Sequence, residues 1–176
     1  PEVERKIVSL KPSDAVLELA DEIAERAEQI SLGNVDPTID NMLKVTSDGK
    51  KLALDPRCYD PKAEDEEGSK LNVCADNIAE IWNDTHETKS TQIVFCDLST
   101  PKKAFEDYLY GEDFDVYNDL KYKLVQRGIP PEQIAFIHDA NTDLQKQALF
   151  DKVNSGTIRV LIGSTEKCGA GTNVQE

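Results

Sequence analysis

Hydroxyl, amide and small side chains cluster in three short segments in the second half of the chain. They are 99–101 (Ser-Thr-Pro), 138–142 (His-Asp-Ala-Asn-Thr) and 164–173, and each directly follows an apolar run that predicts a β-strand. In open parallel sheets, ligands bind beyond the carboxyl ends of the strands, where hydroxyls, amides and exposed N–H groups suit phosphate oxygens. Helix caps use the same residue types, so one such segment is weak support. Three in succession strengthen the prediction of a phosphate-binding edge.

The last of these segments carries two glycines separated by one residue, Gly169 and Gly171. Glycines allow the backbone to approach a ligand closely. The segment lacks the Gly-x-x-x-x-Gly-Lys-Ser/Thr pattern of a Walker A loop, and it lacks the third glycine of a dinucleotide-binding fingerprint. It therefore indicates a nucleotide or phosphate contact of another kind, and a tight loop without a ligand is the alternative.

Around these segments, patterns typical of strands and helices alternate. Apolar runs at 91–98, 133–138 and 158–163 predict strands, and the patterns at 116–127 and 142–153 predict helices between them. This order predicts an α/β fold, a parallel sheet with flanking helices. The compact apolar run at 91–98 is typical of a buried strand.

A helical segment is predicted before the sheet. Apolar residues at helical spacing indicate an amphipathic helix over 13–31, capped by Ser13. Asp36-Pro37 predicts the start of a second, short helix, and Ser47-Asp48-Gly49 predicts a turn after it. Residues 55–69, with two prolines and an acidic run, predict an exposed loop that leads into a further helix.

The charge of the chain argues against a free-standing nucleic-acid-binding protein. The 176 residues carry a formal net charge of −14, whereas phosphate contacts require Lys and Arg. The acidity is uneven: residues 1–89 hold 11 basic and 21 acidic groups (net −10), and residues 90–176 hold 9 and 13 (net −4). A DNA groove in the second half would therefore need help from residues outside this chain.

The remaining composition excludes several other classes. The four cysteines form no Cys-x-x-Cys pair, so we expect no zinc site, and a reducing, cytoplasmic compartment fits their use. No apolar run approaches the roughly 20 residues that span a bilayer, so we expect no membrane partner.

Two stretches of the chain resemble the second motor lobe of superfamily 2 helicases. Residues 93–100 (IVFCDLST) resemble helicase motif IV, and residues 136–175 resemble the segment that ends in motif V. The Ser-Thr-x-x-x-Gly-x-Gly-x-Asn form of that motif is similar to the chromatin-remodeller-like branch. Residues 40–57 and 163–175 resemble, more narrowly, the large helicase–DNA methylase proteins of bacterial conjugative elements and phages. Lys146 stands where Arg is usual, and Cys168 stands where Met is expected.

The resemblance implies a domain organisation and a set of contacts. Residues 1–68 are expected to be a helical linker or insert, and residues 69–176 a C-terminal RecA-like lobe truncated before motif VI. The expected DNA-backbone contacts are Ser99, Thr100 and Thr165, with Lys167 as a further candidate phosphate contact. The residues expected toward ATP are Gly169, Gly171 and Asn173.

The same resemblance implies that the parent protein is a hydrolase, an ATP-dependent helicase or DNA translocase that uses ATP and Mg²⁺. Its partners would be DNA and the missing N-terminal RecA-like lobe. The chain lacks a Walker A loop and carries no expected catalytic or metal-binding residue, so we expect it to be inactive alone. A small phosphate-binding or protein-interaction α/β domain without motor activity is the main alternative, and a glycosyltransferase-like sugar-nucleotide lobe is a weaker one.

Overall fold

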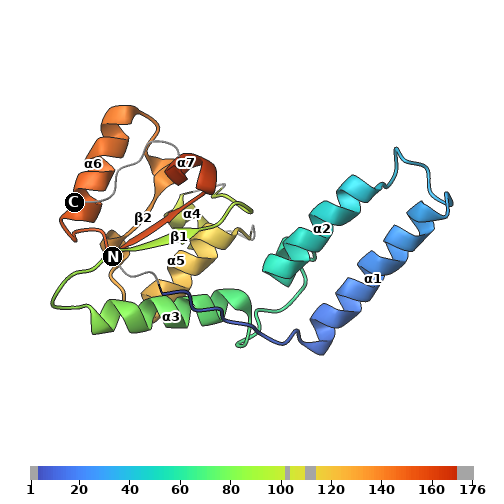
Figure 1. The fold of residues 1–176 in the computed structure, drawn as a ribbon, viewed down its shortest axis with the longest axis horizontal. Coiled ribbons are helices and arrows are strands. Elements are labelled where there is room, and N and C mark those ends of the chain that lie inside the picture. Colours follow the sequence, from blue (N-terminus) through green and yellow to red (C-terminus); the bar gives the residue numbers. More distant parts are fainter. Residues whose placement is uncertain (1–3, 102–103, 110–113, 170–176) are drawn as a thin grey trace. The chain divides into compact units, whose positions relative to one another are not determined.

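The computed structural model describes residues 4–101, 104–109 and 114–169. Two compact units make up the chain, Pro1–Lys70 and Leu71–Glu176. The described part of the first unit is helical, and the second unit is built on a three-stranded parallel sheet (Figure 1). The predicted fold class, an α/β parallel sheet with flanking helices and a helical segment before it, is confirmed.

Helix α1 (Asp14–Ser31) begins where the sequence predicts. The side chain of Ser13 accepts a hydrogen bond from the N–H of Val16 at 3.2 Å and so caps the helix. No residue of α1 is fully buried, and a half-buried apolar stripe runs along one side, where α1 packs against α2. The stripe consists of Val16, Leu19, Ile23, Ala27 and Ile30.

Helix α2 spans Met42–Leu54 and differs from the sequence prediction for this region. The predicted helix start at Asp36-Pro37 is wrong, because Asp36 accepts hydrogen bonds from the N–H and hydroxyl of Thr38 and holds a turn there. The helix begins after Asn41, whose side chain accepts from the N–H of Lys44 at 3.1 Å. Its N-cap is therefore an asparagine, not the Asp-Pro pair.

The predicted turn at Ser47-Asp48-Gly49 is also wrong, since these residues lie inside α2. A glycine within a helix costs roughly 1 kcal/mol relative to alanine. Tertiary contacts offset this cost: Val45 and Leu52 are buried, and Asp48 binds the guanidinium of Arg26 in α1 at 3.1 Å. Packing against α1 thus decides the conformation of a segment whose local sequence favours a turn.

Residues 55–69 are less exposed than predicted. Asp55 is only 2% exposed, and its carboxylate accepts two hydrogen bonds from the guanidinium of Arg57, each of 2.9 Å. Asp55 also begins the short 3₁₀ helix Pro56–Cys58 by accepting the N–H of Arg57. A paired, buried carboxylate therefore anchors the start of the segment that the sequence assigned to an exposed loop.

Three parallel strands form the sheet of the second unit: β1 (Gln92–Phe95), β2 (Ile134–Phe136) and β3 (Val160–Gly163). Their order is β1-β3-β2, so β3 is the central strand. Phe95 is in register with Gly163, and Phe136 with Ile162. The carboxyl ends of all three strands therefore meet at one edge of the sheet.

Helices cover both faces of this sheet (Figure 1). On one face, α3 and α5 pack with the strands around a core that includes Ala75, Tyr117 and Leu124. On the other face, α6 and α7 contribute to a smaller core around Phe150 and Leu161. The helices of this unit are α3 (Lys70–Asp84), α4 (Phe105–Leu109), α5 (Val116–Gln126), α6 (Asp143–Asn154) and α7 (Thr165–Gly169).

Strand β1 departs from the prediction of a fully buried strand. Its exposure alternates, with Ile93 39% and Phe95 56% exposed. The reason is the covering of its two faces: among the described residues, the smaller core on one face of the sheet contains residues of β2 and β3 but none of β1. An apolar run of this length does not show whether both faces of its strand are covered.

Candidate functional site

The segments that follow the three strands lie together at the carboxyl edge, which we define as residues 96–100, 137–142 and 164–169. The parallel register brings the ends of β1 and β3 side by side. The α7 segment in turn packs against residues 137–139. The three polar segments singled out in the sequence are therefore neighbours in space.

A carboxylate joins two of these segments. The backbone N–H of Thr165 donates to Oδ1 of Asp97 at 2.7 Å, and the Thr165 hydroxyl donates to Oδ2 at 2.9 Å. Asp97 follows β1, and Thr165 follows β3, 68 positions later in the chain. Both donors of Thr165, for which the helicase resemblance implies a DNA-backbone contact, are thus occupied by a negatively charged group.

The predicted glycine-rich loop begins as a helix. Residues Thr165–Gly169 form α7, whose first N–H groups bind side chains: that of Thr165 binds Asp97, and that of Lys167 binds Ser164 Oγ at 3.3 Å. These acceptors satisfy the orphan donors that a helix start leaves. Thr165 is exposed and Lys167 is half-buried.

The residues expected toward ATP are described only in part. Gly169 is the last residue of α7. Gly171 and Asn173 lie outside the described residues.

Ser99 and Thr100 differ in their surroundings. Ser99 has φ 54°, a left-handed conformation that non-glycine residues rarely adopt, and its Oγ accepts the N–H of Val116 at 3.0 Å. Ser99 therefore supports the first turn of α5, and among the described residues its hydroxyl hydrogen has no acceptor. Thr100 is exposed.

Tyr117, which the sequence did not single out, contacts the ends of both β1 and β2. Its hydroxyl donates to the carbonyl oxygen of Cys96 at 2.5 Å, and its ring meets the rings of Phe136 and His138 edge to face. The side chain is fully buried, and burial raises the pKa of its phenol, so the hydroxyl stays protonated and remains a donor. Tyr117 thus holds the backbone at Cys96, between the end of β1 and Asp97.

His138 packs edge to face against the ring of Tyr117, and its charged neighbours at the carboxyl edge are Lys167 and Asp139. Burial lowers its pKa, the ammonium of Lys167 lowers it further, and Asp139 opposes both effects. Within the described residues, its buried Nδ1 atom has no hydrogen-bond partner. The imidazole is therefore held in its neutral form beside a lysine.

Lys121 is a second residue that the sequence did not single out. It is half-buried, with its ammonium 4.8 Å from the ring centroid of Phe105 and 5.5 Å from that of Phe136. Burial lowers its pKa, and the carboxylates of Asp139 and Glu106 oppose that change. Its spacing of four residues from Tyr117 places both on one face of α5, which is the signal that could have identified it.

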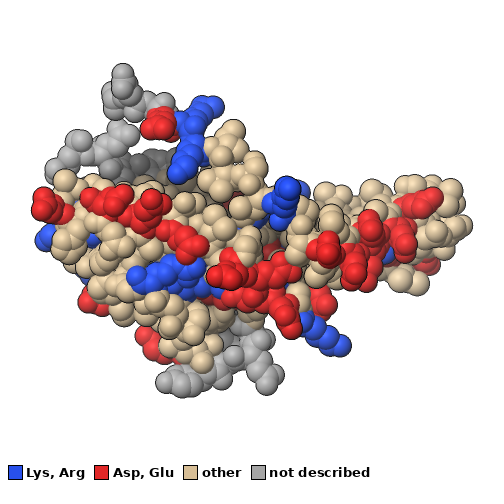
Figure 2. Space-filling view, turned by 90° about the horizontal axis from the view of Figure 1, so that it is seen from below, with Lys and Arg blue, Asp and Glu red and all other residues tan. Residues whose placement is uncertain are grey.

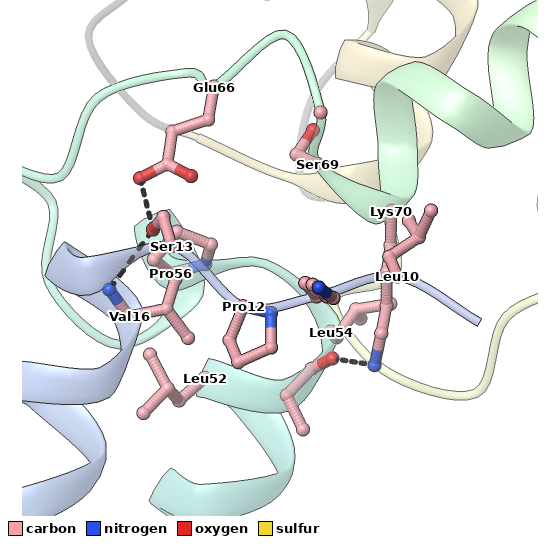
Figure 3. Close-up of a pocket in the computed structure, with 13 residues that line it drawn as sticks. Leu10, Pro12, Ser13, Val16, Leu52, Leu54, Pro56, Glu66, Ser69 and Lys70 are labelled. Atoms are coloured by element: carbon pink, nitrogen blue, oxygen red, sulfur yellow. Dashed lines mark hydrogen bonds between the residues drawn. The ribbon is translucent and has the colours of Figure 1, made fainter.

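A separate cavity of about 220 Å³ lies within the first unit (Figure 3). Its walls are largely apolar, formed by Leu10, Pro12, Val16, Leu52, Leu54 and Pro56. At its rim Ser13 donates to Glu66 at 2.7 Å, and the ammonium of Lys70 donates to the carbonyl oxygen of Ala53. These bonds hold the ends of the two helices and the 66–70 segment together, a structural role that accounts for the polar groups.

The described part of the chain holds no group of three or more His, Cys, Asp or Glu side chains arranged to bind a metal ion. None of its helices is long and apolar enough to cross a membrane. Compared with known proteins, the chain matches no family model, no curated protein and no solved structure.

Proposed function

We propose that the second unit is the C-terminal RecA-like lobe of a superfamily 2 helicase or DNA translocase. In this proposal the carboxyl edge contacts the DNA backbone through Ser99, Thr100, Thr165 and Lys167. The observation that carries the proposal is that the segments after β1 and β3, which hold these residues, are joined by the Asp97–Thr165 contact. Hydroxyl and ammonium donors gathered at one sheet edge match the acceptor-only character of phosphate.

The nucleotide-binding part of the proposal concerns the residues from Gly169 onward. Gly169, Gly171 and Asn173 would face ATP and Mg²⁺ at the interface with an N-terminal RecA-like lobe supplied by the parent protein. That lobe would provide the phosphate cradle and the metal ligand that hydrolysis requires. The parent would act on DNA in the cytoplasm, and DNA methylation, if the parent performs it, would belong to another region.

Thr165→Ala in the full-length parent tests the DNA contact. A hydroxyl bound to a charged oxygen contributes roughly 1.5–3 kcal/mol, so the DNA concentration for half-maximal ATPase stimulation should rise about tenfold or more. Thr157→Ala is the matched control, because it removes an exposed hydroxyl just before β3, at the opposite edge of the sheet. An unchanged stimulation curve with a loss of roughly 1 kcal/mol in stability would show that Thr165 only supports α7.

The alternative to a motor is a phosphate-binding or protein-interaction α/β domain, and the charge distribution favours its protein-interaction form. The net charge is −14, and α1 exposes a row of carboxylates along one side (Figure 2). The row consists of Asp14, Glu18, Asp21, Glu22, Glu25 and Glu28. Such a surface repels DNA and attracts basic proteins.

The parent sequence distinguishes the two candidates. A Gln-x-x-Gly-Arg-x-x-Arg pattern shortly after Glu176 would favour the motor, because it would supply the arginine that stabilises transition-state charge. A parent without ATPase activity would favour the binding domain.

A further inference from the structure

Thr165 uses both of its hydrogen-bond donors on one carboxylate. Its N–H and its hydroxyl bind the two different oxygens of Asp97, at 2.7 and 2.9 Å. A phosphate group presents two anionic oxygens that can accept the same pair of donors. The carboxylate of Asp97 therefore occupies the position that a backbone phosphate needs when it binds Thr165.

A carboxylate and a phosphate cannot share these donors. Both are anions that only accept hydrogen bonds, and two negative charges within reach of one N–H and one O–H repel each other. Within the described ranges, no Lys or Arg side chain forms an ion pair with Asp97. A phosphate that approaches Thr165 thus meets a carboxylate that no described Lys or Arg side chain pairs with.

Asp97 can leave Thr165 without disturbing the sheet. It is exposed and lies two positions after Phe95, the last residue of β1, so water can solvate the carboxylate once it turns away. The preceding residue, Cys96, stays in place because its carbonyl accepts the hydroxyl of Tyr117. Rotation of one side chain is sufficient to expose both donors of Thr165.

We propose that Asp97 is an inhibitory carboxylate that competes with DNA phosphate for Thr165, an inference that rests on the proposed DNA-contact function of Thr165. Asp97 keeps the lobe closed to DNA until other contacts of the parent bring a phosphate close enough to displace it. The residue therefore sets the affinity of the carboxyl edge for DNA without contacting DNA itself.

The experiment measures binding of a short labelled DNA duplex to the 176-residue chain at about 20 mM salt, where phosphate contacts are strong. Asp97→Ala frees both donors of Thr165, and the affinity should rise about tenfold or more. Asp97→Asn keeps one carbonyl acceptor for Thr165, so its gain should be smaller. Asp139→Asn is the matched control, because it removes a negative charge after β2 at the same edge and leaves the Thr165 contact intact.

The double variant Asp97→Ala/Thr165→Ala isolates the contact between the two residues. In the Thr165→Ala background, Asp97→Ala should raise the affinity for DNA no more than Asp139→Asn does. If Asp97→Ala does not raise the affinity for DNA, or raises it only as much as Asp139→Asn does, the inhibitory role is overturned. The DNA function is still supported in that case if the wild-type affinity depends on Thr165. If no variant binds the duplex, the inhibitory role of Asp97 is overturned, and the DNA function is judged separately by the Thr165→Ala test in the full-length parent. Thermal melts confirm that each variant is folded.

Discussion

Gly163, the last residue of β3, lies directly against Cys168 of α7. A Cβ atom at position 163 would overlap Sγ of Cys168 and would come within 2.7 Å of Cγ2 of Ile137. Two of the three segments of the carboxyl edge therefore pack against a bare α-carbon. This contact fixes how closely α7 and residue 137 approach the end of the central strand.

Gly163→Ala should displace α7. Forcing a methyl group into this packed contact should cost about 1–3 kcal/mol of unfolding free energy. Urea unfolding measures the loss, and amide NMR shifts within 164–169 locate it. Gly163→Ala/Cys168→Ala removes the larger overlap and should recover part of the loss. Unchanged stability and unchanged α7 signals in the single variant would show that the edge adapts freely.

Two glycines in different units should respond to alanine with opposite signs. Gly156 has φ 68°, and an added Cβ would lie 2.8 Å from Cβ of Lys89, so Gly156→Ala should destabilise the second unit by about 1–3 kcal/mol. Gly49 lies inside α2 with open space around it, so Gly49→Ala should stabilise the first unit by about 0.5–1 kcal/mol. Amide hydrogen exchange measures the stability of each unit separately. If both substitutions change stability in the same direction, the conformations assigned to the two glycines are contradicted.

Tyr117→Phe should weaken the second unit. It removes the part-buried hydrogen bond from the Tyr117 hydroxyl to the carbonyl of Cys96, at a cost of about 1–2 kcal/mol. Tyr122→Phe, at an exposed position of the same helix, is the control and should leave the melting temperature unchanged. A similar small effect from both variants would mean that the Tyr117 bond contributes no net stability.

The Tyr117 bond should also be sensitive to alkaline pH. Burial raises the pKa of Tyr117 in the folded protein above the value of about 10 that a tyrosine has when unfolded. The stabilisation is therefore complete below pH about 10 and is lost as the pH rises from there toward the folded-state pKa. Urea unfolding across this range should show the stability difference between wild type and Tyr117→Phe narrowing, and a constant difference would contradict the burial of the phenol.

His138 should titrate below its ordinary range. Burial and the nearby Lys167 depress its pKa, so the neutral imidazole contributes stability above pH about 6.5 that is lost as the pH falls through the folded-state pKa. NMR titration of the imidazole measures this pKa directly. Lys167→Met removes the neighbouring positive charge and should move the pKa upward, whereas Lys152→Met, on the exposed surface of α6, should leave it in place.

Local signals in the sequence were sufficient for much of the fold. Ser13 caps α1 as predicted, Thr142 caps α6, and Gly128 follows α5 with φ 91°. Each signal depends on hydrogen bonds or backbone conformations within a few residues, so it can be read without knowing the rest of the chain. The order of strands and helices then implied parallel strands whose carboxyl ends share an edge, which is why the three polar segments could be grouped.

Other features depend on partners that are distant in the chain. α2 continues through Gly49 because α1 packs against it, and Phe95 is exposed because the described residues of the smaller core pack on β2 and β3 but not on β1. The contact between Asp97 and Thr165 exists because β1 and β3 are neighbours, a pairing that no local pattern specifies. Long-range packing thus decided which donors of the candidate site are occupied, since hydrogen bonding follows spatial neighbours and not sequence spacing.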